Sequence, residues 1–396
     1  MTLPATSKPF VAIACGGTGG HLFPGLAVAG QLQARGCDVV LLISPKEVDQ
    51  AAVKSVPAIK TLILPAVGLQ NRNYFSFAYS FWKSWRTAGR FFKQNPPAAV
   101  LAMGGFTSAP PIFAARHAGA RTFLHESNTI PGKANRFLSR YVDEAFIGFG
   151  EAGDRLKARK TTVTGTPVRA QFSGVSERAM ECRTALGLDP ERPTILVVGG
   201  SQGARGLNEM VLAALPLLKA RQWQWLHLAG VSDEAKVRDG YAEQGIKAIV
   251  KPFFAEMDLA LGAATAAVSR AGASSLAEIA ACRLPSLLVP FPAAADNHQF
   301  YNARAFVSSG AALLQEQKSA TPENVAALLT ALVEDGQLRT KMKTALAQWH
   351  APQAAEQIAS HILENILLSR EQAGSARGQQ GRRSGQPADS AQHAVG

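Results

Sequence analysis

The 396-residue sequence lacks several features that mark particular protein classes. Its four cysteines show neither Cys-x-x-Cys spacing nor nearby histidines, so we expect no structural metal and no disulfide framework. No Asp-x-Asp occurs, which removes one common means of holding a metal ion on a diphosphate. No apolar run approaches the roughly 20 residues of a membrane span. The first residues, MTLPATSKPF, lack the hydrophobic stretch of a signal peptide, so we expect a cytoplasmic protein.

Acidic residues are missing from one long part of the first half. Between Gln50 and His125 there is no Asp or Glu, in a chain whose formal net charge is +12. The same stretch holds nine basic residues: Lys54, Lys60, Arg72, Lys83, Arg86, Arg90, Lys93, Arg116 and Arg121. This distribution indicates a basic field directed at an anionic ligand or surface.

Glycine is concentrated in the segment Val11–His21, which reads VAIACGGTGGH and is followed by periodic apolar residues from Leu22 onward. The pattern predicts a buried parallel strand that runs into a helix N-terminus. Backbone N–H groups and the helix dipole favour an anion there, so the loop is interpreted as a phosphate seat. The third position of a Gly-x-Gly-x-x-Gly fingerprint falls on Leu22, and no Walker loop follows, so neither ordinary NAD nor ATP binding is favoured. A merely tight strand-to-helix turn would have the same residues.

The same design recurs in the second half of the chain. Thr194–Val198 is an apolar strand pattern, Gly199–Gly206 reads GGSQGARG, and a helical pattern follows. Two similar nucleotide-type domains that face one another explain this repeat better than two unrelated turns. Short apolar strands alternate with helical segments along both halves, which predicts an α/β fold with parallel sheets.

Polar or glycine-rich loops follow other predicted strands as well. In the first half these are MGGF at 103–106 and HESN at 125–128. Parallel strands bring their carboxyl ends to one edge of a sheet, which is where open α/β sheets bind ligands. The segment Gly165–Arg169 is interpreted as a turn between domains, from which Arg169 could reach a cleft.

Two segments of the second half also fit a ligand site. Arg270–Glu278 (RAGASSLAE) predicts a strand end, a turn of small residues and a helix start. Glu278 is usually only a charge that complements the helix dipole at such a place, but beside the other loops it is interpreted as an acceptor for ribose hydroxyls. Pro290–Asn302 packs six hydrogen-bonding side chains after a strand, which suits a polyhydroxylated ligand.

The segment Tyr74–Lys93 is rich in aromatic and basic residues. On a helix, one face carries Phe77, Phe81, Trp85, Ala88 and Phe92, and the opposite face carries Lys83, Arg86, Arg90 and Lys93. Tyr79 and Trp82 project toward the basic face, which favours peripheral docking on an anionic bilayer. Nucleic-acid stacking and a plain buried helix with a solvated basic side remain open alternatives. The residues expected at the membrane are Phe77, Phe81, Trp82, Trp85, Lys83 and Arg86.

The end of the chain changes character. Thr321–His361 has a largely helical pattern. Residues 369–396 are polar and glycine-rich without periodicity, and they are predicted to be a disordered tail.

Taken together, GGTGGH, MGGF, HESN, GTPVR, GGSQGAR, RAGASSLAE and DNHQ resemble the MurG family. This is a family of bacterial transferases that move N-acetylglucosamine from UDP onto a lipid-linked muramyl-pentapeptide. The resemblance runs from about Phe10 to about Leu367. It implies an α/β glycosyltransferase B fold, in which two Rossmann-like domains face each other across a cleft.

The resemblance also implies that the two domains bind different substrates. Residues 9–168, completed by a C-terminal helix at about 353–368, would form the acceptor- and membrane-facing domain, and residues 169–350 the UDP-sugar domain. The expected substrates are UDP-N-acetylglucosamine and undecaprenyl-diphospho-N-acetylmuramoyl-pentapeptide, with transfer to its 4-hydroxyl, and no cofactor. The expected place is the cytoplasmic face of the inner membrane, on its anionic leaflet. Cell-wall synthesis and division proteins are candidate partners, and nucleic acid is not.

Family donor contacts fall by position on one set of residues: Thr18, Gly19, Gly20, Asn128, Arg169, Ser201, Phe254, Ala273, Ser274, Ser275, Leu276, Ala277, Glu278 and Gln299. The resemblance implies that Glu278 holds the ribose and Gln299 the sugar hydroxyls. Three positions depart from the commoner pattern. Ser127 stands where glutamine is frequent, Ala271 where serine is, and Phe254 where an aliphatic residue often lies against uracil.

Transfer to a hydroxyl needs a base near that hydroxyl and positive potential near the diphosphate. His21 is the candidate base, because the positive end of a helix disfavours the imidazolium and keeps the ring neutral. A single displacement with inversion would follow. The alternative role for His21 is a cap that binds phosphate without moving a proton.

Two other functions fit the same residues. A related nucleotide-sugar enzyme, such as a glycolipid synthase or a UDP-sugar epimerase, would keep the donor loops and change the acceptor surface. A non-catalytic UDP-sugar-binding scaffold for wall assembly is the second alternative, and the intact His21 and Glu278 argue against it.

Overall fold

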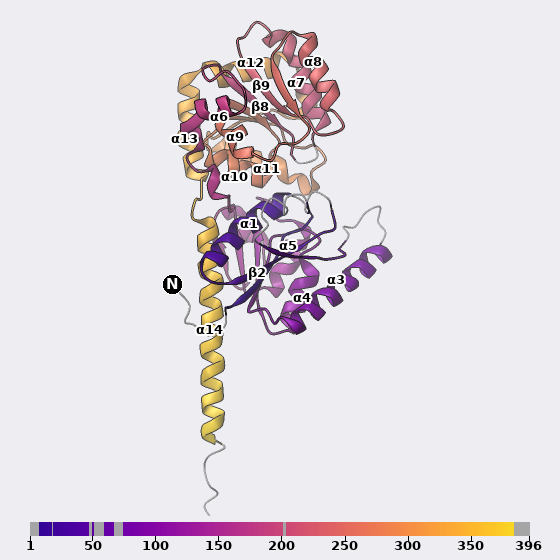
Figure 1. The fold of residues 1–396 in the computed structure, drawn as a ribbon, viewed down its shortest axis with the longest axis vertical. Coiled ribbons are helices and arrows are strands. Elements are labelled where there is room, and N and C mark those ends of the chain that lie inside the picture. Colours follow the sequence, from indigo (N-terminus) through magenta and orange to yellow (C-terminus); the bar gives the residue numbers. More distant parts are fainter. Residues whose placement is uncertain are drawn as a thin grey trace, which may run out of the picture.

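A computed structural model describes residues 8–17, 19–46, 50, 59–66, 74–200 and 203–383. These residues form two α/β domains, the first below the second in Figure 1. The first sheet has the strand order β3-β2-β1-β4-β5-β6-β7, and the second has the order β10-β9-β8-β11-β12-β13. Neighbouring strands in both sheets pair in parallel. The prediction of two parallel α/β halves is confirmed.

Both faces of the first sheet are covered by helices, so its central strands are apolar at successive positions. Val11 and Ile13 of β1 pack under α1 and α14, whereas Ala12 and Ala14 pack under α3, α4 and α5. The strands are β1 (Phe10–Ala14), β2 (Asp38–Ile43), β3 (Lys60–Ile63), β4 (Ala99–Ala102), β5 (Arg121–Glu126), β6 (Glu144–Ile147) and β7 (Thr161–Val163). The helices are α1 (Gly19–Ala34), α3 (Tyr74–Gln94), α4 (Ala109–His117), α5 (Lys133–Leu138) and α14 (Ala354–Arg383).

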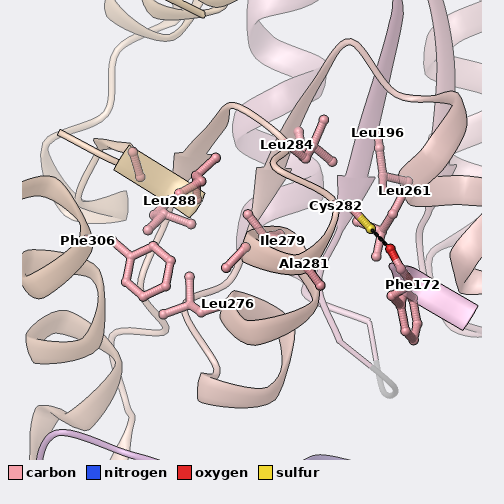
Figure 2. Close-up of a cluster of buried hydrophobic side chains, with 14 of the residues drawn as sticks. Phe172, Leu196, Leu261, Leu276, Ile279, Ala281, Cys282, Leu284, Leu288 and Phe306 are labelled. Carbon is pink, nitrogen blue, oxygen red and sulfur yellow. Dashed lines mark hydrogen bonds between the residues drawn. The ribbon is translucent and has the colours of Figure 1, made fainter. Parts of the chain in front are cut away.

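The second sheet is covered in the same way. Leu196 of β8 packs in the cluster of Figure 2, together with α6, α9, α10 and α11. Ile195 and Val197 face α7, α8 and α12. The strands are β8 (Thr194–Val198), β9 (Gln224–Leu228), β10 (Ala248–Lys251), β11 (Ala266–Ser269), β12 (Ser286–Leu288) and β13 (Leu313–Leu314). The helices are α6 (Ala179–Ala185), α7 (Arg205–Leu218), α8 (Glu234–Glu243), α9 (Met257–Ala263), α10 (Ala273–Ala281), α11 (His298–Ser308), α12 (Pro322–Glu334) and α13 (Gly336–Trp349).

The repeat noticed in the sequence is a repeat of topology. The order β3-β2-β1-β4-β5 in the first sheet matches β10-β9-β8-β11-β12 in the second. Each glycine-rich turn follows the central strand of its sheet, β1 or β8, and leads to α1 or α7. The chain changes direction across the sheet beside these strands, and such switch points are where open α/β sheets bind ligands.

Helix α14 leaves the second domain and packs along the first, beside α1 (Figure 1). Ile358, Ile362 and Ile366, spaced by four residues, are buried against the first sheet. The buried Glu144 carboxylate of β6 pairs with His361 at 3.0 Å and with Lys160 at 3.0 Å. Among the helices of the described ranges, none combines the length and apolar composition needed to cross a bilayer.

The tail differs from the prediction of disorder. Helix α14 continues through residue 369 to Arg383, and it projects beyond the body of the first domain in Figure 1. Once its buried turns are fixed, each added residue gains one backbone hydrogen bond, so the polar residues that follow can continue the helix despite their lack of an apolar face. Residues 384–396 lie outside the described residues.

Helix α3 is confirmed, but its buried side differs from the predicted apolar stripe. The buried residues are Ser80, Ser84, Ala88 and Phe92, whereas Trp85 is 39% exposed. Three of these four side chains are small and spaced by four, which lets α3 approach α4 closely and turns the larger rings to the edges of the contact. Phe77 and Phe81 are therefore half-buried, and Trp85, on the same predicted apolar face, is exposed.

The chain passes between the two domains twice, near Gly165 and near Ala351, and these two segments are in contact. Gly165, with φ of +78°, lies so close to Ala351 that an added Cβ would come within 2.3 Å of the Ala351 Cβ. Beside this crossing, Phe149 follows the first-domain strand β6 but is buried among second-domain rings. Its centroid lies 5.3 Å from the ring of Trp349 and 6.3 Å from that of Phe306. These contacts join the domains at one side.

Candidate active site

Loops from both sheets meet between the domains. Helix α1, which begins with Gly19 and Gly20, contacts α10 of the second domain. Residues 128 and 129, after β5, hydrogen-bond to α11. The carboxyl edges of the two sheets therefore face a common boundary, as the sequence predicts for a ligand that bridges two domains.

His21 lies in the first turn of α1, and two glycines of the MGGF loop make room for its ring. An added Cβ on Gly104 would lie 2.9 Å from His21 Cε1, and one on Gly105 would lie 3.2 Å from His21 Cδ2. Both glycines have positive φ, +109° and +78°. The loop is tied to the first glycine-rich turn, because Thr107 Oγ1 donates to the Gly16 carbonyl at 2.7 Å. The imidazole is thus held between the two predicted loops.

Glu126 organises the segment after β5. Its Oε1 accepts from the Asn128 backbone N–H at 2.8 Å and from Asn128 Nδ2 at 2.9 Å. Its Oε2 accepts from the Gly132 N–H and from Asn135 Nδ2, both at 2.9 Å. A buried carboxylate with four donors is fully satisfied, so Glu126 fixes Asn128 and is not itself free to bind a ligand.

His125 is a structural residue. Its Nε2 bonds to the Gly165 carbonyl at 3.1 Å, and its Nδ1 bonds to Ser127 Oγ at 3.2 Å. Burial lowers the pKa of His125, so the ring is neutral in this environment. It links β5 to the interdomain crossing at Gly165.

The second glycine-rich turn rests on a buried polar network. Gly203 approaches the Ala229 carbonyl so closely that a Cβ would lie 2.6 Å from this oxygen. Asn208 Nδ2 donates to the same carbonyl and to Asp233 Oδ2, both at 2.9 Å. His227 Nε2 lies 3.0 Å from Asn208 Oδ1, and burial lowers the pKa of His227 to about 3, which keeps it neutral. The base of this turn is therefore rigid.

Arg169 and Glu278 interact electrostatically at the domain boundary. The Arg169 guanidinium lies 4.6 Å from the ring centroid of Phe23 in α1 and 5.0 Å from that of Phe172. Its Nε is buried and has no hydrogen-bond partner in the part of the chain that the structure describes. Burial raises the pKa of Glu278 to about 7, and the Arg169 charge opposes this rise. A half-buried carboxyl and a cation with unused donors are suited to bind polar groups of a ligand.

Arg270 supplies a buried positive charge at the ends of β11 and β12. It donates to the Val289 carbonyl at 3.0 Å, the Pro290 carbonyl at 3.1 Å and Gln317 Oε1 at 2.7 Å. Burial lowers the pKa of Arg270 to about 10, so it stays charged near neutral pH. No carboxylate within the described ranges pairs with it. A buried cation of this kind is suited to stabilise negative charge on a ligand.

Gln299, in the first turn of α11, has an orientation fixed by the backbone. Its Oε1 accepts from the Ala271 N–H at 3.2 Å and from the Phe291 N–H at 3.0 Å. Its Nε2 has no protein partner among the described residues. The side chain is therefore presented as a hydrogen-bond donor, which fits the oxygen of a sugar hydroxyl.

The structure brings most of the predicted site residues to this boundary. Gly19, Gly20 and His21 begin α1, Asn128 follows β5, and Arg169 lies at the crossing. Phe254 follows β10 and packs on the second-domain core. The six residues Ala273 to Glu278 lie in α10, after Gly272 in extended conformation. Thr18 and Ser201 lie outside the described residues.

Sequence reasoning missed three contributors, although each lies in a motif that it singled out. Glu126 belongs to HESN, Arg270 begins RAGASSLAE, and Asn302 ends the polar loop after β12. The density of polar side chains identified these segments as candidate ligand sites. Only the fold shows which of the polar side chains hydrogen-bond to the protein itself. Within the described ranges, no group of three or more His, Cys, Asp or Glu side chains is placed to hold a metal ion.

Comparisons with known proteins agree with this geometry. Residues 11–147 match the glycosyltransferase family 28 N-terminal domain, and residues 194–358 match the glycosyltransferase family 28 C-terminal domain. A protein of Anaeromyxobacter sp. strain Fw109-5 is 36% identical, over 93% of this chain and 96% of its own length. One of Xanthomonas axonopodis pv. citri is 38% identical, over 89% of this chain and 82% of its own. Both carry the name UDP-N-acetylglucosamine--N-acetylmuramyl-(pentapeptide) pyrophosphoryl-undecaprenol N-acetylglucosamine transferase.

Solved structures give the same result. The crystal structure of Acinetobacter baumannii MurG is similar with a TM-score of 0.71 and 29% identity, and the match covers 90% of this chain and all of that one. A UDP-N-acetylglucosamine 2-epimerase from Listeria monocytogenes, at 15% identity and a TM-score of 0.68, shares the fold alone. The two domains are those of a glycosyltransferase B fold. From its two family 28 domains and its full-length similarity to named relatives, this chain belongs to the MurG family of UDP-sugar glycosyltransferases.

Proposed function

We propose that this chain transfers N-acetylglucosamine from UDP-N-acetylglucosamine to the 4-hydroxyl of undecaprenyl-diphospho-N-acetylmuramoyl-pentapeptide, with inversion at the anomeric carbon. The observation that carries the proposal is the convergence at one domain boundary of His21 from one domain with Glu278 and Gln299 from the other. Relatives that align over nine-tenths of the chain bear the corresponding name, which supports the choice of substrates.

The second domain holds the donor in this proposal. Glu278 accepts the ribose hydroxyls, and Gln299 donates through Nε2 to a sugar hydroxyl. The α10 segment from Ala273 to Ala277 and Phe254 complete the nucleotide site, with Ser201 and Thr18 assigned by position in the sequence. The half-buried Glu278 carboxyl and the orientation of Gln299 support these roles.

The first domain presents the acceptor. The acceptor oxygen attacks the anomeric carbon, the bond from that carbon to the diphosphate oxygen breaks, and UDP leaves with the electron pair. His21 takes the proton of the attacking hydroxyl. The buried Arg270 and the guanidinium of Arg169 stabilise negative charge that develops on the diphosphate.

We also propose that α3 rests on the anionic cytoplasmic leaflet, which places the enzyme peripherally at the inner membrane. Phe75 and Trp82 are 92% and 47% exposed, and Tyr79 stands beside them with its ring 6.2 Å from Trp82. Arg86 stacks on the Trp82 ring at 4.9 Å, and Lys83 is exposed next to it. Exposed rings interleaved with cations are suited to the headgroup level of a bilayer. The half-buried Phe77 and Phe81 would support this surface from below.

The test is product analysis with the purified full chain. The protein is mixed with labelled UDP-N-acetylglucosamine and a short-chain lipid diphosphate carrying the muramyl-pentapeptide, and products are separated by mass. We expect a disaccharide lipid and one UDP per transfer, and a β linkage by NMR. Release of free sugar without acceptor, or formation of a 2-epimer, would contradict the proposal.

The His21→Ala variant should lose turnover and keep UDP-sugar binding. Parallel loss of both would assign His21 to phosphate binding.

A further inference from the structure

We propose that Asn302 of α11 is a positioning residue that holds the first-domain segment Asn128–Thr129 against the donor site of the second domain. The inference rests on the proposed function, because it assigns Asn302 a part in that transfer. Asn302 lies in the polar loop and helix region after β12, for which the sequence predicted a polyhydroxylated ligand. The structure shows that its side chain is fully buried and meets protein on every side.

All four hydrogen-bonding sites of the Asn302 side chain are used. Its Oδ1 accepts from the Thr129 backbone N–H and from Thr129 Oγ1, both at 2.9 Å. Its Nδ2 donates to Asn128 Oδ1 at 3.0 Å and to the Ala271 carbonyl at 3.1 Å. Three of these bonds cross from the second domain to the first, and the fourth ties Asn302 to its own domain. A buried amide with this set of partners specifies one relative position of the two domains.

Asn128 is held from both sides. Its backbone and its Nδ2 donate to Glu126 within the first domain, and its Oδ1 accepts from Asn302. One Nδ2 hydrogen and one oxygen lone pair of Asn128 remain for a ligand. The orientation of this predicted donor contact therefore depends on the second domain being in place.

The same face of α11 carries the donor contact. Gln299, Asn302 and Phe306 are spaced by three and four residues, which puts them on one side of the helix. Gln299 fixes the backbone of Ala271 and Phe291, and Asn302 bonds to the carbonyl of the same Ala271. Phe306 stacks on Trp349 at 4.5 Å, beside Phe149 at the interdomain crossing. One rigid helix thus joins the sugar contact, the first domain and the crossing.

A second contact spans the boundary near the start of α11. Arg136 of α5 pairs with Asp296 at 2.5 Å. Asp296 and Asn297 both have left-handed backbone, with φ of +50° and +53°, a conformation that Asp and Asn adopt more readily than other non-glycine residues. Both partners of the ion pair are over a third exposed, so solvent screens it, and the buried Asn302 bonds carry the coupling.

Loss of the Asn302 hydrogen bonds should therefore affect UDP binding and sugar transfer differently. Most of the proposed nucleotide contacts, Glu278 among them, lie in the second domain, so loss of Asn302 should change UDP affinity little, although Asn302 orients the first-domain donor contact Asn128. Transfer requires His21 of the first domain to lie at the right distance from the sugar, so it depends on the bonds of Asn302. Misplacement of a reacting group by about 1 Å costs on the order of 100-fold in rate.

The experiment compares Asn302→Ala with wild type in three measurements: UDP affinity by calorimetry, steady-state kinetics, and the radius of gyration in solution under saturating UDP-N-acetylglucosamine. We expect a kcat lower by about 100-fold, a UDP dissociation constant within about threefold of wild type, and a larger radius of gyration. Thr129→Val removes one of the crossing bonds without enlarging the cavity, and it should show the same pattern in smaller measure. Thr129→Ser keeps the hydroxyl and should restore kcat.

Outcomes separate this inference from the proposed function. If Asn302→Ala and Thr129→Val retain wild-type kcat and radius, Asn302 does not position the site. If UDP affinity and kcat fall together, with Thr129→Ser no better than Thr129→Val, the residue is merely structural and the inference is overturned. A wild-type protein that binds UDP-N-acetylglucosamine and is more compact than Asn302→Ala, yet makes no disaccharide lipid, would overturn the proposed function and leave the domain contact standing.

Discussion

Gly104 packs against the ring of His21, at a distance that leaves no room for a side chain. A Cβ at residue 104 would lie 2.9 Å from His21 Cε1, and the backbone there has φ of +109°. Gly104, the first glycine of the MGGF motif, thus allows the chain to turn and also leaves space for the ring of the proposed base.

The variant Gly104→Ala should therefore lose activity through His21. We expect kcat to fall about 100-fold, because the added methyl group displaces the imidazole. UDP-sugar affinity should stay within about twofold, since Glu278, Gln299 and most of the other proposed donor contacts are in the other domain. Steady-state kinetics and calorimetry on the same preparation check both numbers.

Gly119→Ala is the matched control. Gly119 has φ of +76° and nothing within 4 Å of an added Cβ, so the variant also places alanine at a positive φ, but away from the site. It should cost about 1 kcal/mol of stability and leave kcat unchanged. Equal loss of kcat in both variants would attribute the Gly104 effect to folding and not to His21.

Membrane binding should depend on the exposed rings of α3. We expect the triple variant Phe75→Ser, Trp82→Ser and Trp85→Ser to bind anionic vesicles at least about tenfold more weakly, since each buried ring contributes about 1.5–3 kcal/mol. Flotation with vesicles of anionic lipid measures this, and raised salt should weaken the wild type through its Lys and Arg residues. The double variant Val231→Ser and Phe253→Ser removes two exposed apolar groups of the second domain, and it should float like wild type. Unchanged flotation of the triple variant would remove α3 from the membrane surface.

The glycine-rich turns could be predicted from the sequence because their signal is local. A buried strand, glycines and a helix start lie within about a dozen residues of one another, and the repeat of this unit predicts the repeat of topology. The buried side of α3 could not be predicted so well. Large rings dominate a helical pattern, whereas close packing on α4 selects the small Ser80, Ser84 and Ala88.

The interdomain bonds could not be predicted from one sequence. Thr129 and Asn302 are 173 positions apart, and no local pattern pairs them. A polar run such as Pro290–Asn302 indicates that its side chains form hydrogen bonds, but it does not indicate with what. In our proposal Gln299 binds a ligand, whereas Asn302 binds the other domain. The extension of α14 beyond residue 369 could not be predicted from amino-acid composition either. A helix that continues from buried turns needs no apolar face of its own.

Helix α14 should stabilise the first domain only through its buried turns. We expect Ile362→Ala to lower the free energy of unfolding by about 2–4 kcal/mol, because Ile362 is fully buried against the first sheet. Leu368→Ala, at a position that is 54% exposed on the same helix, should change it by less than about 0.5 kcal/mol. Truncation after Glu371 should leave the midpoint of thermal unfolding unchanged. A large loss of stability on that truncation would show that the projecting part of α14 has a packing role of its own.

Glu278 should make donor binding depend on pH near neutrality. Burial raises the pKa of its carboxyl from 4.5 to about 7, so the free protein holds this proton below about pH 7. A carboxylate accepts more hydrogen bonds from ribose hydroxyls than a protonated acid does, so UDP-N-acetylglucosamine should bind more weakly as pH falls through 7. Arg169→Gln removes the opposing charge and should move this transition to higher pH. Calorimetric titrations between pH 5.5 and 8.5 measure both effects, and an affinity that is independent of pH would contradict the role of Glu278.

The same raised pKa has the opposite effect on stability. Between the unfolded value near 4.5 and the folded value of about 7, the folded chain binds a proton that the unfolded chain has released, so the contribution of Glu278 to stability declines as pH rises through this window. Glu278→Gln removes the desolvated charge and should raise the free energy of unfolding at pH 8 by about 1–2 kcal/mol after allowance for solvent screening, with the difference vanishing toward pH 5. It should also weaken UDP-sugar binding at pH 8 by about tenfold. A variant that binds the donor normally and gains no stability at pH 8 would show that the carboxyl is neither strained nor used.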